Sequence, residues 1–358
     1  MSKIRYYISS HGLGHASRSC QIINTLRRRH PEVAVEVVSA AHPWFFQGFL
    51  DPSVTVRPLL LDLGVLQRDS LIMCERETLQ AYRDFLPERE RIVAAEAASL
   101  QREAVTLVAS DIPPCPFAAA RAAGLPSVAI GNFTWDWIYQ GLAEKFPGYG
   151  DVLDSVRADY RCADRLLRLP FYGNFPAIRR IEPLSLVARR SLRTPAEVRR
   201  LLGVAEGKKL GLISFGGFGL SDFRFDALDR LSDWIFLTEV GLGGQAANLR
   251  TISPGSLPYP DLVRAADGVI TKPGYGIVSE AIANETAVLY TSRGDFREQA
   301  LLVSALQRYA RALEIDNDDL RQGNWGEALE RLSALPRPAE KIAMDGDVVA
   351  ADRLAELA

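Results

Sequence analysis

The chain has 358 residues, enough for two domains of ordinary size, and 47% apolar and 24% charged residues are typical of a globular protein. The formal net charge of −2 argues against a nucleic-acid binder that works through bulk positive charge. No apolar run approaches the roughly eighteen residues of a membrane span, and the N-terminus has no signal-peptide core. We therefore expect a cytoplasmic protein with no integral membrane segment and no nucleic-acid partner.

Short apolar runs alternate with longer amphipathic stretches through the first half of the chain. The apolar runs predict strands at 3–9, 33–39, 54–61, 105–110, 127–130 and 166–169. The amphipathic stretches predict helices at 16–29, 76–103, 116–123, 135–145 and 151–162, with Pro87 breaking the second of them into two. This alternation predicts a parallel sheet with helices on both faces.

The segment 169–185 carries three prolines and a glycine and fits neither period, which is typical of an interdomain linker. The alternation then restarts, with strands expected at 209–215, 234–240, 249–252, 268–271, 287–291 and 312–315, and helices between and after them. We expect an N-terminal Rossmann-like domain at 1–170, a linker at 171–185 and a C-terminal Rossmann-like domain at 186–335. A C-terminal segment at 336–358 is expected to return to the first domain as a helix. Two such halves place a ligand crevice at the carboxyl edges of both sheets.

The segment 9–18 reads SSHGLGHASR and lies between the first strand and the first helix. Gly12 and Gly14 allow a sharp turn and a close approach of a ligand to the main chain, where the helix start offers free N–H groups. The spacing is not the full GxGxxG pattern and no acidic residue ends the second strand, so NAD binding is disfavoured. His11 and His15 flank the glycines as candidate functional residues, and the alternative is that they only cap the turn.

Asp111 ends the strand at 105–110 and is expected to lie beside His15. A histidine oriented by a carboxylate is a better general base, so His15 with Asp111 is the predicted catalytic pair, and His11 is the alternative base. Trp135 and Asp136, in the segment GNFTWDWIY at 131–139, are assigned to the acceptor side of the crevice. Core packing or helix capping is the alternative for these two residues.

A second glycine cluster, SFGGFG at 214–219, follows the first strand of the second half. Gly216, Gly217 and Gly219 are predicted to form a phosphate cradle, with a tight turn and no ligand as the alternative. The Lys-Ser/Thr pair of a Walker loop is absent from the cluster, so a P-loop NTPase is disfavoured.

Two further segments, ADGVITKPGYGIVSE at 266–280 and TSRGDFREQ at 291–299, each join a strand to a helix. Glu280 is placed to accept hydrogen bonds from both hydroxyls of a ribose, unless it is a surface glutamate favoured by the helix dipole alone. Arg293 or Arg297 is placed to neutralise phosphate, unless the second segment is only a solvated loop. The predicted donor-binding residues are Gly14, Gly216, Gly217, Gly219, Lys272, Gly274, Tyr275, Gly276, Glu280, Arg293, Asp295, Glu298 and Gln299.

The run KPGYGIVSE followed by a strand and DFREQ resembles the donor-binding signature of glycosyltransferases with the GT-B fold, most of all the N-acetylglucosaminyltransferase of peptidoglycan synthesis. The resemblance implies that Glu280 holds the donor ribose, that the 216–219 glycines face the diphosphate, and that the residues at 298–299 face the donor sugar. It also implies that His15 lies in the cleft.

Four segments together resemble the N-terminal glycosyltransferase-like domain of plant L-arabinokinase and its stand-alone bacterial relatives, over nearly the whole chain. They are HGLGHASR at 11–18, GNFTWDWIY at 131–139, LRLPFY at 167–172 and KPGYGIVSE at 272–280. In that family the kinase chemistry belongs to a separate C-terminal domain, so the resemblance does not imply kinase activity.

These observations predict an α/β protein of the GT-B fold, with two Rossmann-like domains whose parallel sheets face each other across a cleft. The leading hypothesis is an inverting, metal-independent glycosyltransferase that uses a UDP- or TDP-sugar donor, an unidentified acceptor and no cofactor. No D-x-D motif follows a strand, which agrees with a metal-independent reaction. The alternatives are a non-catalytic nucleotide-sugar-binding or regulatory protein, and an epimerase or hydrolase on the same fold.

Overall fold

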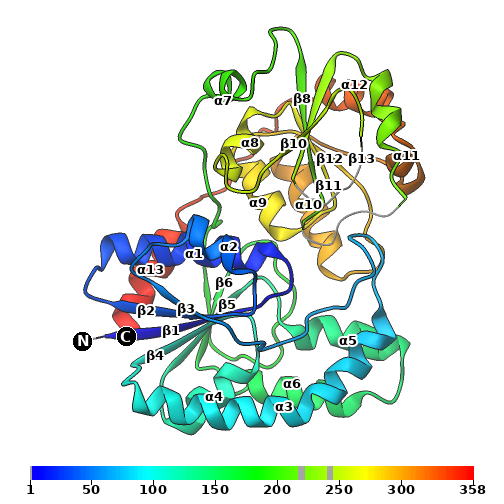
Figure 1. Ribbon diagram of the computed structural model, residues 1–358. Coiled ribbons are helices and arrows are strands. Elements are labelled where there is room, and N and C mark those ends of the chain that lie inside the picture. Colours follow the sequence, from blue (N-terminus) through cyan, green and yellow to red (C-terminus); the bar gives the residue numbers. More distant parts are fainter. Residues whose placement is uncertain (1, 217–221, 240–244) are drawn as a thin grey trace. The chain divides into compact units, whose positions relative to one another are not determined.

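The computed structural model describes residues 2–216, 222–239 and 245–358. Two compact units, each built on its own parallel sheet, make up this part of the chain (Figure 1). The first unit contains the residues up to Leu66 together with Cys74–Val187 and Ala343–Ala358. The second contains Gln67–Met73 and Ala188–Ile342. The chain therefore enters the second unit twice, first for only seven residues and later for the long segment that begins at Ala188.

The first sheet has seven strands in the order β3-β2-β1-β4-β5-β6-β7, a doubly wound arrangement that starts from the middle of the sheet. Its strands are β1 (Lys3–Ile8), β2 (Ala34–Val38), β3 (Thr55–Arg57), β4 (Leu107–Asp111), β5 (Ser127–Gly131), β6 (Arg165–Arg168) and β7 (Ile181–Pro183). Every strand pair is parallel, and Ile8 of β1 lies opposite Asp111 of β4. The loops after β1 and β4 therefore leave the sheet side by side.

Helices cover both faces of this sheet (Figure 1). One face carries α1 (Leu13–Arg29), α2 (Pro43–Phe49) and α13 (Gly346–Leu357). The other carries α3 (Glu75–Arg102), α4 (Cys115–Ala123) and α6 (Gly150–Tyr160), and α5 (Trp135–Lys145) packs against α3 and α6. Hydrogen bonds from Gln21 and Thr25 of α1 to Asp347 of α13, at 2.8 and 2.7 Å, join the C-terminal helix to this unit.

Two local expectations differ from the structure. The break at Pro87 is wrong, because α3 runs unbroken from Glu75 to Arg102. Side chains buried on both sides of the proline, such as Tyr82 and Ile92, hold the two halves of the helix against the same surface. The segment expected to be only a linker also contains β7, which pairs with β6 and extends the first sheet.

The second sheet has six strands in the order β10-β9-β8-β11-β12-β13. The strands are β8 (Lys209–Ser214), β9 (Trp234–Glu239), β10 (Leu249–Ile252), β11 (Gly268–Thr271), β12 (Val288–Tyr290) and β13 (Ala312–Glu314). The helices of this unit are α7 (Pro195–Leu201), α8 (Tyr259–Ala265), α9 (Tyr275–Ala283), α10 (Glu298–Tyr309), α11 (Asn317–Gln322) and α12 (Gly326–Ala334), with a 3-10 turn at Phe225–Arg230.

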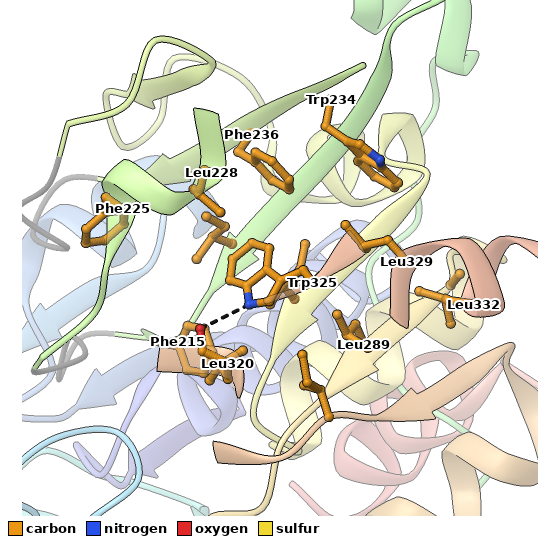
Figure 2. Packing of buried hydrophobic residues seen from close by; sticks show 14 of the residues in the cluster. Phe215, Phe225, Leu228, Trp234, Phe236, Leu289, Leu320, Trp325, Leu329 and Leu332 are labelled. Carbon is orange, nitrogen blue, oxygen red and sulfur yellow. Dashed lines mark hydrogen bonds between the residues drawn. The ribbon is translucent and has the colours of Figure 1, made fainter. Parts of the chain in front are cut away.

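Alternating side chains of β9 serve two different cores, as expected for a sheet covered on both faces. Trp234 and Phe236 pack with Trp325 on one face, whereas Ile235 and Leu237 join the cluster under α8 on the other. Figure 2 shows the first of these cores, where the indole N–H of Trp325 donates to the Leu320 carbonyl at 3.0 Å. The fully buried indole is thus both packed and hydrogen-bonded.

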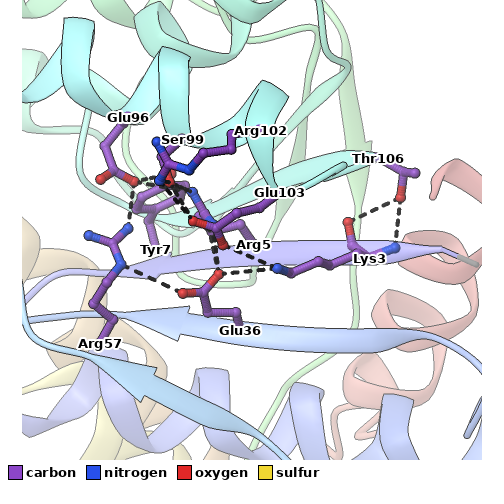
Figure 3. Close-up of polar contacts among 10 residues, drawn as sticks. All are labelled: Lys3, Arg5, Tyr7, Glu36, Arg57, Glu96, Ser99, Arg102, Glu103 and Thr106. Atoms are coloured by element: carbon purple, nitrogen blue, oxygen red, sulfur yellow. Dashed lines mark hydrogen bonds and ion pairs between the residues drawn. The ribbon is translucent and has the colours of Figure 1, made fainter.

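A charged network fills the space between α3 and the strands of the first sheet (Figure 3). Arg5, in the middle of β1, is fully buried and forms ion pairs with Glu36, Glu96 and Glu103. Arg57 donates to Glu96 at 2.7 Å. The network joins α3 to β1, β2 and β3.

Among the helices of the described residues, none is both long and apolar enough to cross a membrane.

Candidate functional site

The first group of predicted site residues lies where β1 ends and α1 begins. Gly12 has φ = 73°, a left-handed conformation that suits glycine, and it caps the N-terminus of α1. His15, Arg18 and Ser19 lie three and four residues apart in the first turns of the helix, so they share one face. That face is turned toward the end of β4.

Asp111, at the end of β4, is the fully buried centre of this group. One carboxylate oxygen, Oδ1, lies 2.8 Å from Nδ1 of His15 and 2.6 Å from Nη2 of Arg18. The other, Oδ2, accepts from Nε of Arg18 at 2.7 Å and from Oγ of Ser19 at 3.0 Å. Burial acts to raise the pKa of Asp111, but the charge and hydrogen bonds of Arg18 and His15 outweigh it and lower the pKa to about 2.

The structure therefore brings His15 and Asp111 together. It also places the guanidinium of Arg18 on the same carboxylate, which changes the electrostatics of the pair. Arg18 binds Asp111 through two parallel hydrogen bonds and also donates to Oδ1 of Asn132 at 2.8 Å. Because the guanidinium compensates the carboxylate, Asp111 is not an isolated anion behind the imidazole. It fixes the ring with Nδ1 toward the protein, which leaves Nε2 as the nitrogen on the far side.

A second buried carboxylate, Asp62, follows β3 and lies near the same histidine. It accepts from Oγ of Ser9 at 3.0 Å and from the indole N–H of Trp135 at 2.7 Å. Burial raises the pKa of Asp62 above its ordinary value. The rings of His11 and Trp135 meet edge to face at 5.2 Å, so Trp135 links this carboxylate to the alternative base.

The two residues predicted to face the acceptor, Trp135 and Asp136, have no exposed surface. The structure supports the core alternative for their immediate surroundings: Trp135 packs among Phe133, Tyr139 and the histidine rings. Burial also raises the pKa of Asp136, whose carboxylate lies 3.8 Å from Nε of Arg157.

Gly64 fixes the position of His11. It has φ = 60°, and a Cβ atom placed there would lie 2.4 Å from Cγ of His11, which is closer than van der Waals contact permits. The backbone N–H of Val65 points toward Nδ1 of His11 at 3.3 Å. The loop after β3 thus holds the ring of His11 by close contact and by a hydrogen bond.

In the second unit, two buried or partly buried cations follow neighbouring strands. Lys272 comes directly after β11, and Arg293 comes shortly after β12. Burial, followed by repulsion from Arg293, lowers the pKa of Lys272 to about 7. Burial also lowers the pKa of Arg293 to about 10, although Glu298 opposes the shift, and the guanidinium lies 3.6 Å over the ring of Phe296.

The glycine turns of the second unit are only partly described. Gly274 caps the N-terminus of α9, and Gly276 lies in its first turn with the buried Tyr275 between them. The first backbone N–H groups of this helix follow Lys272 closely in the chain. Gly216 has φ = 71°, whereas Gly217 and Gly219, the rest of the predicted phosphate cradle, lie outside the described residues.

Glu280, predicted to hold a ribose, is buried within α9 and paired with Arg189. Nε of Arg189 donates to Oε1 of Glu280 at 2.6 Å. Asn284, one turn further along the helix, donates to the Arg189 carbonyl at 3.1 Å. Arg189, in the segment that enters the second unit, therefore already binds one oxygen of the Glu280 carboxylate, which was predicted to hold a ribose.

The remaining predicted donor residues lie in the loop between β12 and α10. Gln299 accepts from the Arg293 backbone N–H at 2.7 Å and donates to Ser292 at 3.0 Å, so its amide shapes the loop. Glu298 is buried at 3.5 Å from the Arg293 guanidinium, whereas Asp295 is exposed. Gly14 lies in the first unit, in the first turn of α1.

Sequence reasoning did not assign Arg18, Asp62, Arg189 or Gly64. Two of these carried a usable signal. Arg18 is three residues from His15 on the same helical face, and Asp62 follows a strand just as Asp111 ends one. Arg189 and Gly64 depend on contacts between segments far apart in the sequence, which local patterns do not reveal.

Over the residues that the structure covers, no three His, Cys, Asp or Glu side chains are grouped as a metal site would require.

Comparison with solved structures identifies the class of this fold. UGT89C1 of Arabidopsis thaliana matches with a TM-score of 0.63 and 14% identity over 99% of both chains. UGT2 of Phytolacca americana, in complex with UDP-2fluoro-glucose and pterostilbene, matches with a TM-score of 0.61 and 16% identity. The match covers 100% of this chain and 94% of that one. MurG of Acinetobacter baumannii matches with a TM-score of 0.55 and 13% identity, over 99% of this chain and 100% of that one. The protein has the GT-B glycosyltransferase fold, as the sequence predicted.

No model of a known protein family matches the chain. One curated protein gives the more particular relationship: the chain is homologous to L-arabinokinase of Arabidopsis thaliana, with 31% identity over 363 aligned residues. The alignment takes in 99% of this chain and 34% of the plant protein, so the chain spans about a third of the length of its relative. The resemblance drawn from the four sequence motifs is thereby confirmed.

Proposed function

We propose that the protein is an inverting, metal-independent glycosyltransferase that uses a nucleoside-diphosphate sugar as donor. The observation that carries the proposal is the imidazole of His15 held by Asp111 at 2.8 Å, at the carboxyl end of β4 and the start of α1. In the tautomer whose Nδ1–H donates to Asp111, Nε2 is available to take a proton from an acceptor hydroxyl. Solved proteins of the same fold were crystallised with UDP-2fluoro-glucose and with dTDP, which supports a nucleotide donor.

In the proposed reaction, Nε2 of His15 takes the proton of the acceptor hydroxyl while the acceptor oxygen forms a bond to the anomeric carbon. The bond from that carbon to the diphosphate oxygen breaks, and the diphosphate leaves with the electron pair. Attack from the opposite side inverts the anomeric configuration. Lys272, Arg293 and the start of α9 supply positive charge for the leaving diphosphate, so the reaction needs no metal ion.

The first experiment measures donor binding. A thermal-shift screen with UDP, dTDP, ADP and GDP and their sugars is expected to give a rise in Tm for one nucleotide class, because a ligand of the folded state stabilises it by mass action. Glu280→Gln is expected to weaken that binding at least tenfold. Absence of a shift with every nucleotide would remove the donor from the proposal.

The second experiment separates the base from the donor site. His15→Gln should keep nucleotide binding and reduce transfer by about 10² to 10⁴, the range of general-base catalysis. His11→Gln is the matched variant and is expected to lose much less. If the two losses are reversed, His11 is the base; if neither variant loses transfer, the proposed mechanism is wrong.

A nucleotide-sugar-binding protein without turnover is a second candidate, and one observation favours it. Arg18 already pairs with Asp111, so less of the charge of this carboxylate is left to support His15 as a base. Mass spectrometry of the products decides between the functions. Transfer requires an acceptor, epimerisation or hydrolysis converts the donor without one, and a binding protein leaves the donor intact.

A further inference from the structure

A short hairpin from the first half of the chain belongs to the second unit. The chain leaves the first unit after Leu66, and residues Gln67–Met73 pack with the second unit before the chain returns at Cys74. Gln67 and Met73 pair in an antiparallel bridge, and the N–H of Arg68 donates to the Ile72 carbonyl at 2.9 Å. The tip consists of Asp69, Ser70 and Leu71, all of them buried.

The tip is anchored at the carboxyl end of β8. Leu71 is part of the hydrophobic core that contains Phe215, and Oγ of Ser70 donates to the Phe215 carbonyl at 2.6 Å. Phe215 directly precedes Gly216, the first residue of the predicted phosphate cradle. The hairpin therefore occupies the edge of the second sheet at which the donor diphosphate is proposed to bind.

Asp69 is held with its carboxylate fixed. Oδ1 accepts from the backbone N–H groups of Leu71 and Ile72 at 2.8 and 2.9 Å, and Oδ2 accepts from Nη2 of Arg321 at 3.3 Å. Only 3% of Asp69 is exposed. Hydrogen bonds from two backbone N–H groups and a guanidinium favour the charged form of a carboxylate.

This carboxylate interacts with two cations of the second unit, Arg321 and Lys272. Arg321 of α11 binds it directly. The charges of Asp69 and Arg293 both act on the ammonium group of Lys272, the first favouring and the second opposing its protonation. Near the tip, Cε of Met73 would lie 4.0 Å from a Cβ placed at Gly294, the residue after Arg293. Arg321 thus contacts the carboxylate, and Lys272 feels its charge. Arg293, which pairs with Glu298, is a further cation that acts on Lys272.

We propose that Asp69 is an internal counter-anion, which partly neutralises the cations of the donor-phosphate site and competes with the diphosphate for them. The proposal rests on the proposed donor site and adds a residue of the opposite charge to it. In the absence of ligand, Asp69 compensates cations that would otherwise repel one another. In its presence, the same fixed charge repels the incoming diphosphate and weakens its binding.

The test is Asp69→Asn, which removes the charge and keeps an oxygen that can accept from the two backbone N–H groups. Calorimetry at low salt and about pH 5.5, below the Lys272 pKa of about 7 so that this side chain keeps its charge, would measure binding of inorganic pyrophosphate, UDP and dTDP to the full chain. For each anion that binds to the wild-type protein, we expect the Asp69→Asn variant to bind about tenfold more tightly. Asp84→Asn, on the exposed surface of α3 beside Gln80, is the matched control and should change nothing.

Equal or weaker anion binding by a folded Asp69→Asn protein overturns the inference, even if UDP binds to both proteins and the proposed donor site stands. Tighter pyrophosphate binding with no nucleotide binding supports the counter-anion and contradicts the proposed function. Absence of all binding in both proteins contradicts both proposals.

A second readout does not require a ligand. In Asp69→Asn, NMR titration of methylated lysines should show the pKa of Lys272 shifted further down, because the charge that favours its protonation is gone. An unchanged pKa would mean that Asp69 has only a structural role in the hairpin.

Discussion

At the residue scale, the pair formed by Arg18 and Asp111 makes the site sensitive to the loss of either partner. Arg18→Met leaves a fully buried carboxylate without its cation, which typically costs about 3–5 kcal/mol. We expect urea unfolding at pH 7 to show a loss of this size. Arg121→Met, at an exposed position on α4, is the control and should change the free energy of unfolding by less than about 0.5 kcal/mol.

The pH dependence of this pair is set by the lowered pKa of Asp111. The folded pKa, about 2, is below the ordinary value of 3.8, so the stabilisation is fully present above pH 3.8 and is lost as the pH falls toward 2. In Arg18→Met, burial acts to raise the pKa of the same carboxyl, and its protonation relieves the variant. The stability difference between the wild-type protein and Arg18→Met should therefore shrink as the pH falls from 7 toward 2. A difference that grows on acidification would contradict the assignment.

Gly64 offers a test of His11 that leaves the histidine itself unchanged. In Gly64→Ala the new methyl group must displace the His11 ring, and the left-handed backbone adds strain of about 1 kcal/mol or more. We expect a loss of stability of about 1–3 kcal/mol, measured by urea unfolding. Gly124→Ala carries a similar backbone strain with open space around the new methyl group, so it separates strain from displacement of His11. If His15 is the base, transfer per folded molecule should survive in both variants.

At the scale of elements, α3 is joined to the first sheet by charge as well as by apolar packing. Arg5→Met leaves Glu36, Glu96 and Glu103 facing one another without their shared cation (Figure 3). We expect a loss of about 3–5 kcal/mol in the free energy of unfolding. Lys3→Met belongs to the same network at a partly exposed position and should cost less than about 1 kcal/mol. Equal losses in the two variants would contradict the central role of Arg5.

At the scale of the whole molecule, the regular alternation of strands and helices in the sequence was enough to predict the two parallel sheets. The contact between His15 and Asp111 was also predicted, because both residues follow strands of the same expected sheet. The structure makes these strands, β1 and β4, neighbours whose ends meet at one edge. The hairpin that carries Asp69 was not predicted, since a polar loop gives no local sign of the core that will accept its Leu71. Nor was the pairing of Glu280 with Arg189, which joins residues 91 positions apart.

The buried ammonium group of Lys272, in the proposed donor site, lowers the stability of the folded protein. Lys272 has a folded pKa of about 7 against an ordinary value of 10.5, so the folded protein binds fewer protons than the unfolded chain between these values. The buried cation therefore destabilises the fold fully below pH 7, and its effect fades as the pH rises toward 10.5. Lys272→Met removes this cost. Since one pKa unit corresponds to about 1.4 kcal/mol, we expect a gain of ~1–4 kcal/mol at pH 7.

Urea unfolding of Lys272→Met and of wild-type protein between pH 6 and pH 10 checks the sign. The variant should be more stable at pH 6 and the difference should shrink toward pH 10, while Lys341→Met, at an exposed position, should show neither effect. The same Lys272→Met protein should bind pyrophosphate more weakly, because it has lost a cation of the proposed donor site. If Lys272→Met gained stability and kept its affinity for pyrophosphate, Lys272 would not belong to the proposed donor site. The wild-type protein would then carry a destabilising buried charge that no bound ligand explains.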